Sequence, residues 1–183
     1  MSDRSRLIEL FLQRSIQHGD FLLASGRHSN YYIDARRTTM LAEGLALVGR
    51  LGLSAIRDSG WSPEAVGGLT LGADPVAYAI AATSIADPPL VNAFTIRKEP
   101  KAHGAGRQVE GNLERGDRVV VVEDVITTGT SARRAIAAAE EAGAVVLGVL
   151  GVVDRFAGGR ELLEADGRKV VVLTTILDLD LVP

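Results

Sequence analysis

The stretch 119–131, Val-Val-Val-Val-Glu-Asp-Val-Ile-Thr-Thr-Gly-Thr-Ser, decides the fold of this chain. Its four consecutive β-branched residues predict a strand that is buried on both faces, as in a parallel sheet. The acidic pair Glu123 and Asp124 stands where that strand should end. The Ala/Glu/Arg-rich run 132–142 then predicts a helix. A strand, a polar loop and a helix in this order are typical of an α/β fold.

The loop between this strand and helix has the composition of a phosphate site. Unpaired backbone N–H groups and the positive end of the helix dipole meet at a helix N-terminus. Gly129 lets the backbone come close to a ligand, and Thr127, Thr128, Thr130 and Ser131 add hydroxyl donors. The stretch therefore predicts a phosphate site, although a strand followed by an ordinary capped helix is the simpler alternative.

The two carboxylates before the loop suit a different part of the ligand. They would repel a phosphate, but they fit an adjacent pair of sugar hydroxyls or a cation. Together with the loop they predict a site for a sugar phosphate. A Walker phosphate loop is excluded because no Gly-Lys-Ser/Thr follows the glycine. A dinucleotide fingerprint is excluded because no Gly-x-Gly-x-x-Gly opens the helix.

Composition limits the class of protein. The 183 residues fit one domain and are 46% hydrophobic but only 4% aromatic, so the core must consist mainly of Leu, Val, Ile and Ala. A net charge of −3 provides no basic field for nucleic acid. The absence of cysteine excludes disulfides and thiolate chemistry. No signal core or apolar run of about 20 residues is found, so we expect a cytoplasmic protein that does not enter a membrane.

The N-terminal region predicts a helix and a hairpin. Apolar residues at helical spacing favour a helix near 3–18. Two short strands at 21–24 and 31–34 are expected around the polar turn 25–30. Tyr31 and Tyr32 in the second strand could stack on a flat ring, or they could be packed tyrosines of a surface hairpin.

From residue 64 onward, strands and helices alternate with short connections. This order predicts a mostly parallel, doubly wound sheet flanked by helices, within a single domain 1–183. In addition to the central unit, we expect a helix at 40–56, a strand at 65–69, a helix at 76–85, strands at 90–96 and 145–153, a helix at 159–165, a strand at 169–175 and an apolar tail at 177–183.

Two other strand ends carry residues suited to ligands. Thr70, Leu71, Gly72 and Ala73 form a second strand-to-helix loop with free N–H groups, although an ordinary tight loop before Pro75 is an alternative. Arg155 follows the strand 145–153, at the sheet edge where ligands of open α/β sheets bind. Its guanidinium suits a carboxylate or a carbonyl edge, and a surface Asp-Arg pair is the alternative.

The segment 97–107 has no apolar period and is not expected to pack as a helix or strand. It includes the cations Arg97, Lys98 and Lys101, together with His103. Such a composition predicts a mobile, positively charged arm that could close over an anionic substrate. The alternative is an ordinary solvated surface segment.

The stretch 119–131 resembles the phosphoribosyl-diphosphate signature of the type I phosphoribosyltransferases. The resemblance implies that Glu123 and Asp124 hold the ribose hydroxyls and that residues 127–131 wrap the 5-phosphate, with Val125 and Ile126 completing the binding segment. The family more often has two aspartates, so Glu123 is a mild departure from its pattern.

Three further segments narrow the resemblance to the orotate phosphoribosyltransferases. Residues 21–34 resemble the N-terminal hood of that family, residues 97–104 its catalytic loop, and residues 153–155 its orotate-contacting strand end. The resemblance implies one phosphoribosyltransferase domain, with a hood formed mainly by about 1–36 and a mobile loop at 97–110. Many members have a lysine where this chain has Ala24, so other groups must supply that charge.

The implied reaction is orotate + phosphoribosyl diphosphate → orotidine 5′-monophosphate + diphosphate, a step of pyrimidine (UMP) biosynthesis. The resemblance assigns orotate to Thr127 and Arg155, beside the two tyrosines, and the diphosphate side to residues 70–73. It further implies the roles of several side chains: Arg97, Lys98, Lys101 and His103 contact the diphosphate side, and Lys101, His103 and Asp124 are the expected catalytic residues.

The resemblance also predicts a cofactor and an assembly. Mg²⁺ is expected, held mainly by substrate and water with no direct protein ligand. The family forms homodimers in which the loop 97–110 reaches into the neighbouring active site. Two alternatives share the central signature: a phosphoribosyltransferase for a purine or other base, and a phosphoribosyl-diphosphate-sensing regulator. The hood and Asp154-Arg155 argue against the first, and the acidic single domain argues against the second.

Overall fold

The computed structural model describes residues 1–22, 28–99 and 108–182. Its elements, in chain order, are α1 (Asp3–Arg14), β1 (Ile16–Leu22), β2 (His28–Ile33), α2 (Arg36–Thr39), α3 (Ala42–Asp58), β3 (Ala65–Leu69), α4 (Ala73–Ser84), β4 (Asn92–Ile96), β5 (Val109–Gly111), β6 (Arg118–Ile126), α5 (Thr130–Glu141), β7 (Val145–Asp154), α6 (Gly159–Ala165), β8 (Val170–Thr175) and the 3₁₀ helix η1 (Ile176–Leu179).

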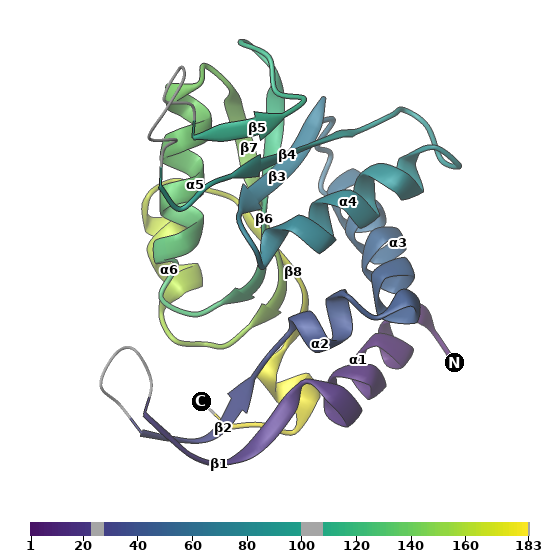
Figure 1. The fold of residues 1–183 in the computed structure, drawn as a ribbon, viewed down its shortest axis with the longest axis vertical. Helices are drawn as coiled ribbons and strands as arrows, with labels where there is room; N and C mark the ends of the chain where they lie inside the picture. Colours follow the sequence, from purple (N-terminus) through teal and green to yellow (C-terminus); the bar gives the residue numbers. More distant parts are fainter. Residues whose placement is uncertain (23–27, 100–107, 183) are drawn as a thin grey trace.

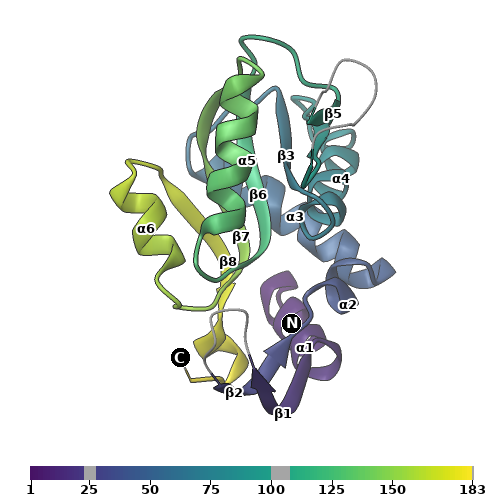
Figure 2. The ribbon, with the colours of Figure 1, turned by 60° about the vertical axis from the view of Figure 1, so that its left-hand side comes forward.

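A six-stranded sheet forms the centre of the molecule, in the order β5-β4-β3-β6-β7-β8. Every neighbouring pair is parallel except β4 and β5, which are antiparallel. Helices α3 and α4 cover one face, and α5 and α6 cover the other (Figures 1 and 2). The predicted fold class, a mostly parallel sheet flanked by helices, is confirmed.

Strand β6 lies in the middle of this sheet and packs on both faces. Val120 and Val122 join a core cluster with side chains of α3 and α4. Val119 and Val121 join a second cluster with side chains of α5. All four valines are completely buried, as the run of β-branched residues predicts.

The prediction that β6 ends at the acidic pair is wrong. The strand continues through Ile126, because Val125 pairs with Val153 and Ile126 pairs with Asp154 on β7. Both added residues are β-branched and suit a strand. Glu123 and Asp124 therefore belong to the last part of a strand and are held by its ladder.

The N-terminal helix is shorter than its apolar spacing predicts. Helix α1 ends at Arg14, with Ser15 as its C-cap, and residues 16–18 belong to β1. Ile16 pairs with Ile33 across the hairpin, and this pairing, distant in sequence, overrides the helical pattern. Strands β1 and β2 form a separate two-stranded sheet at one end of the molecule (Figure 1).

The loop predicted at 97–110 is bounded by strand pairing. Its last two residues, Val109 and Glu110, belong to β5 and pair with Ile96 and Thr95 of β4. At the C-terminus, Leu179 and Leu181 are buried while Leu177 is exposed, so part of the apolar tail packs on the core. Among the described helices, none combines the length and apolar character that crossing a bilayer requires.

Candidate functional site

A pocket of about 310 Å³ lies at the carboxyl edge of the larger sheet. The ends of β3, β6 and β7 meet there because the three strands are parallel. The pocket also receives residues from the segment after β2. Its lining residues are Tyr32, Ile33, Asp34, Ala35, Arg36, Leu69, Thr70, Leu71, Gly72, Lys98, Glu123, Asp124, Val125, Thr127, Ser131 and Arg155.

The acidic pair of β6 forms the desolvated part of this pocket. Glu123 is only 8% exposed, and its Oε2 atom has no hydrogen-bond partner among the described residues. Burial raises the pKa of Glu123 well above its ordinary value, and the negative charge of Asp124 raises it further. A buried acceptor without a partner favours an external donor such as a sugar hydroxyl.

Asp124 is buried but better supported than Glu123. Its Oδ1 atom accepts the N–H of Val125 at 2.9 Å. Burial raises the pKa of the carboxyl, while the hydrogen bond from Val125 and the positive charge of Arg36 oppose that rise. Asp124 thus retains more of its acidity than Glu123, and the pair presents two unlike carboxyl groups to the pocket.

The loop after β3 approaches Asp124 closely. A Cβ atom at Gly72 would lie 2.5 Å from Oδ1 of Asp124, so only glycine fits at this position without movement. Asp74 stabilises the loop by accepting hydrogen bonds from Thr70 Oγ1 at 2.6 Å and Thr95 Oγ1 at 2.9 Å. Helix α4 begins at Ala73, so its free N–H groups face the same edge. Thr70, Leu71 and Gly72 line the pocket, whereas Ala73 is completely buried.

The loop between β6 and α5 leads into a helix N-terminus, a position that suits an anion. Gly129 has φ +76° and precedes the first turn of α5. The loop also packs tightly on the start of α6, because a Cβ atom at Gly159 would lie 2.4 Å from the carbonyl oxygen of Thr127. Thr127 and Ser131 line the pocket.

Other residues predicted for this loop lie outside the pocket lining. The hydroxyls of Thr128 and Thr130 lie 3.0 Å apart and form a hydrogen bond. Ile126 is 1% exposed and packs in the core. Its carbonyl accepts the N–H of Arg155 at 3.0 Å, which connects the ends of β6 and β7.

Arg155 brings the smaller sheet to the pocket. Its guanidinium lies over the ring of Tyr31, 4.9 Å from the ring centroid, and its Nη2 donates to Ser29 Oγ at 3.1 Å. Tyr31 is 5% exposed and supports the arginine without lining the pocket. Tyr32 does line the pocket and packs beside Phe21, with a centroid distance of 5.7 Å. The two adjacent tyrosines therefore have different positions.

The two described cations of the predicted loop also differ. Lys98 lines the pocket, and its carbonyl accepts a hydrogen bond from Arg134 of α5 at 2.7 Å. Arg97 is not among the lining residues, and its guanidinium lies 3.7 Å from the carboxylate of Glu110. Lys101, His103 and Ala24 lie outside the described residues.

Sequence reasoning missed two charged residues of the pocket, Asp34 and Arg36. They follow β2 directly, and Nε of Arg36 donates to Oδ1 of Asp34 at 2.9 Å. The only signal in the sequence is an acid and a base two residues apart after a strand. That spacing does not predict that they face Asp124 of another strand.

The acidic pair is the part of the pocket suited to a cation. No group of three or more His, Cys, Asp or Glu side chains with the arrangement of a metal site occurs in the described segments. Glu123 and Asp124 nevertheless supply carboxylate oxygens, one of them without a partner there. This donor set fits a hard cation that brings most of its own ligands.

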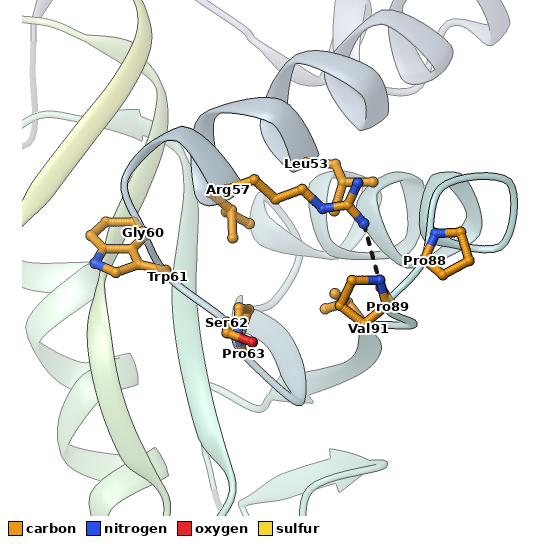
Figure 3. Close-up of a pocket in the computed structure, with 10 residues that line it drawn as sticks. Leu53, Arg57, Gly60, Trp61, Ser62, Pro63, Pro88, Pro89 and Val91 are labelled. Atoms are coloured by element: carbon orange, nitrogen blue, oxygen red, sulfur yellow. Dashed lines mark hydrogen bonds between the residues drawn. The ribbon is translucent and has the colours of Figure 1, made fainter.

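A second hollow, of about 390 Å³, lies at the opposite edge of the sheet, before β3 and β4. Figure 3 shows Arg57 of α3 reaching toward Pro89, whose carbonyl it contacts at 3.5 Å. The walls of this hollow are mainly apolar and include Leu53, Trp61 and Val91. None of the residues predicted for the site lines this hollow, so the predicted chemistry belongs to the carboxyl edge alone.

Comparison with known proteins gives strong similarity over nearly the whole chain. The orotate phosphoribosyltransferase of Rhodopirellula baltica is 44% identical over 185 residues, covering 99% of this chain and 96% of that protein. The enzyme of the same name from Corynebacterium glutamicum (strain R) is 47% identical, with 97% and 94% covered.

Solved structures agree with the sequence comparison. Mycobacterium tuberculosis orotate phosphoribosyltransferase in complex with 5-phospho-α-D-ribosyl 1-diphosphate superposes with a TM-score of 0.83 at 41% identity, covering 98% of this chain and all of that one. No family model matches the chain.

Proposed function

The chain belongs to the orotate phosphoribosyltransferase family, and we infer from this that it transfers the phosphoribosyl group of phosphoribosyl diphosphate to orotate. The products are orotidine 5′-monophosphate and diphosphate, so the protein is a pentosyl-transferring enzyme of pyrimidine biosynthesis. The observation that carries the inference is a single pocket that gathers the acidic pair, both strand-to-helix loops, Lys98 and Arg155.

The phosphoribosyl group is assigned to the end of β6 and the start of α5. Glu123 and Asp124 accept hydrogen bonds from the ribose hydroxyls, which supply the donor that the buried Glu123 oxygen needs. The 5-phosphate binds at residues 127–131, where the N-terminus of α5 provides N–H groups and a positive dipole. The support for this assignment is the left-handed Gly129 and the two lining hydroxyls.

Orotate is assigned to the side of the pocket formed by Thr127, Tyr32 and Arg155. The carboxylate of orotate suits a guanidinium that is already held in one orientation. Tyr31 and Ser29 provide that orientation, so little side-chain entropy is lost when the base binds. Tyr32 presents a ring to the pocket on which the flat base can stack.

The leaving diphosphate is assigned to the loop 70–73 and the cationic segment. Bond breaking at the anomeric carbon builds positive charge on the ribose and negative charge on the diphosphate, so donors and cations aimed at the diphosphate lower the barrier. Lys98 stands at the base of that segment. Lys101 and His103 remain predicted contributors from the sequence, and Lys101→Ala is expected to lower turnover more than substrate binding.

Mg²⁺ is proposed as the cofactor. When bound to the diphosphate oxygens it neutralises their charge during transfer. Glu123 and Asp124 fit contacts to the ribose hydroxyls and to water around the cation. The enzyme is further proposed to be a cytoplasmic homodimer in which the loop 97–110 contributes to the neighbouring site.

An absorbance assay tests the proposed reaction. Purified enzyme with phosphoribosyl diphosphate and Mg²⁺ should deplete the ultraviolet absorbance of orotate. Parallel reactions with adenine, hypoxanthine and uracil identify the base, and omission of Mg²⁺ tests the cofactor. Turnover of a purine without turnover of orotate would assign the enzyme to another base.

Arg155→Ala should raise the KM for orotate by about 10- to 100-fold, because a charge-assisted hydrogen bond to the carboxylate is lost. The KM for phosphoribosyl diphosphate should change much less. Steady-state kinetics with each substrate varied in turn measures both values. Unchanged orotate kinetics in this variant would remove Arg155 from the base site.

A further inference from the structure

Arg36 is one of the two charged residues of the pocket, with Asp34, that neither the sequence signature nor the assigned roles explain. It is the first residue of α2, directly after the smaller sheet. Figure 1 shows α2 between that sheet and α4, and α2 contacts α4. Its side chain is 43% exposed and lines the pocket beside Thr70, Gly72 and Asp124.

The orientation of Arg36 is set by one tether. Its Nε donates to Oδ1 of Asp34 at 2.9 Å, and Asp34 is itself less than a quarter exposed. The two terminal nitrogens of Arg36 make no hydrogen bond with any described residue. A guanidinium fixed at Nε with its two Nη groups available is a bidentate donor for a planar or tetrahedral oxyanion.

The residues around Arg36 indicate which part of an anionic ligand it would contact. The positive charge of Arg36 acts on Asp124, and Asp124 touches Gly72 of the loop after β3. Arg36 therefore faces the corner where the N-terminus of α4 meets the acidic pair. Arg155, the other arginine of the pocket, is engaged by Ser29 and Tyr31 on a different wall.

We propose that Arg36 binds the diphosphate group of phosphoribosyl diphosphate, with Asp34 as the residue that positions its guanidinium. The inference rests on the proposed function, because diphosphate enters the pocket as part of that substrate and leaves as its product. Negative charge grows on the diphosphate as the bond to the ribose breaks, so Arg36 contributes to turnover as well as to binding.

Arg36→Gln is the direct test, and Arg37→Gln is its matched control. Arg37 is the next residue of α2, is exposed and does not line the pocket, so both variants remove one positive charge from the same helical turn. Calorimetric titration with Mg²⁺-diphosphate should show at least about tenfold weaker binding for Arg36→Gln, as expected for a lost charge-assisted contact, and wild-type binding for Arg37→Gln. In a titration with ribose 5-phosphate, the Kd values of the two variants should differ by less than about twofold.

The positioning role of Asp34 has its own test. Asp34→Ala should weaken diphosphate binding in the wild-type background but not in Arg36→Gln, because the two residues act as one unit. Asp34→Asn keeps an acceptor for Nε and should restore most of the binding. Equal losses from Asp34→Ala in both backgrounds would contradict this role.

Two outcomes separate this inference from the proposed function. If the wild-type protein converts orotate but Arg36→Gln and Arg37→Gln bind diphosphate equally well, the role of Arg36 is overturned. If the wild-type protein does not convert orotate, the proposed function fails, while the diphosphate titration still reports on Arg36. Arg36→Lys replaces Arg36→Gln should the glutamine variant not fold, and it should bind diphosphate more weakly than wild type because it lacks the bidentate fork.

Discussion

Gly72, in the loop after β3, and Asp124, in β6, meet in one corner of the pocket. The missing side chain at Gly72 leaves the space that the carboxylate of Asp124 occupies. Glu123, the residue before Asp124, is buried, and its Oε2 atom has no hydrogen-bond partner in the described structure. At the residue scale, the site thus combines a close backbone approach with a carboxyl group whose environment disfavours its charge.

Gly72→Ala is predicted to damage the site while leaving the fold intact. The new Cβ atom would lie within 2.6 Å of the Asp124 carboxylate atoms, so the carboxylate or the loop must shift. This shift of the carboxylate or the loop is expected to lower kcat/KM for phosphoribosyl diphosphate by about 10- to 100-fold. Steady-state kinetics and thermal unfolding measure the two effects. Wild-type kinetics would show that the corner can relax at no cost to function.

Glu123→Gln is predicted to stabilise the folded protein at neutral pH and to impair turnover. Because burial raises the pKa of Glu123, the folded protein holds this proton to higher pH than the unfolded chain does. Stability is therefore lost as pH rises from the ordinary value of 4.5 through the raised pKa. Glutamine cannot ionise, and its amide can donate to Asp124.

The gain from Glu123→Gln should be roughly 1–3 kcal/mol at pH 7.5, because the folded wild-type protein must either hold a desolvated carboxylate charge there or keep a proton that the unfolded chain has released. It should shrink toward zero near pH 4.5. Urea unfolding of both proteins at the two pH values measures it. An equal difference at both pH values would mean that Glu123 ionisation is not the cause.

At the scale of elements, α1 and η1 join the two ends of the chain. Arg4 of α1 donates to the carbonyl of Leu173 at 3.0 Å and to Asp178 of η1 at 2.7 Å. Asp178 also accepts the N–H of Thr175 at 2.8 Å and forms the capping box of η1. Burial acts to raise the pKa of Asp178, but the hydrogen bonds from Arg4 and Thr175 outweigh it and lower the pKa to about 2.

Asp178→Ala is predicted to lower the free energy of unfolding by about 1–2 kcal/mol at pH 7, since a cap and two side-chain contacts are lost while the exposed arginine pair adds little. A lowered pKa stabilises above the ordinary value of 3.8 and loses that effect as pH falls toward 2. The deficit should therefore narrow in acid. Asp180→Asn, at an exposed position where the side chain makes no hydrogen bond or ion pair with any described residue, is the control and should unfold like wild type.

The elements themselves were largely predictable, with failures that have a common cause. Strand β3 and helix α6 have the predicted bounds, because glycines and polar residues delimit them locally. Strand β1 was missed in part because Ile16 fits a helical pattern until it pairs with Ile33. The end of β6 was misplaced because its partner β7 supports two more residues than the carboxylates suggest. The local periodicity of a segment does not predict which distant segment it pairs with.

At the scale of the whole molecule, the site is an assembly of segments that the sequence keeps far apart. The loop after β6, the loop after β3, Lys98 and Arg155 were identified one by one, and the structure brings residues from each of them to one pocket. Asp34 and Arg36 were not identified, because their importance follows from the wall they face across the pocket. The sequence could not tell which of Tyr31 and Tyr32 lines the pocket. Neighbouring strand residues point to opposite sides, but this alternation does not say which side faces the ligand.

The proposed sharing of sites between subunits predicts complementation. Lys101→Ala and Asp124→Asn subunits are each expected to be nearly inactive. After exchange at equal concentrations, half of the dimers pair one of each, and each such dimer has one intact site, so about one quarter of wild-type activity should return. Activity of the mixture after tagged-subunit exchange measures this recovery. Verified exchange without recovered activity would place the loop in its own subunit's site.

The N–H of Arg97 donates to the carbonyl of Gln108 at 2.9 Å, and the side-chain amide of Gln108 donates to the carbonyl of Arg97 at 2.9 Å. These two hydrogen bonds hold both ends of the segment 98–107 together and so limit how far that segment can extend. A chain that leaves and returns to the same anchor can travel outward by only half its contour length. For residues 98–107 that radius is roughly 17 Å. If the segment 98–107 contributes to the active site of the neighbouring subunit, that site must lie within this radius of Arg97. The twofold axis of the proposed dimer must then run close to the β4–β5 edge.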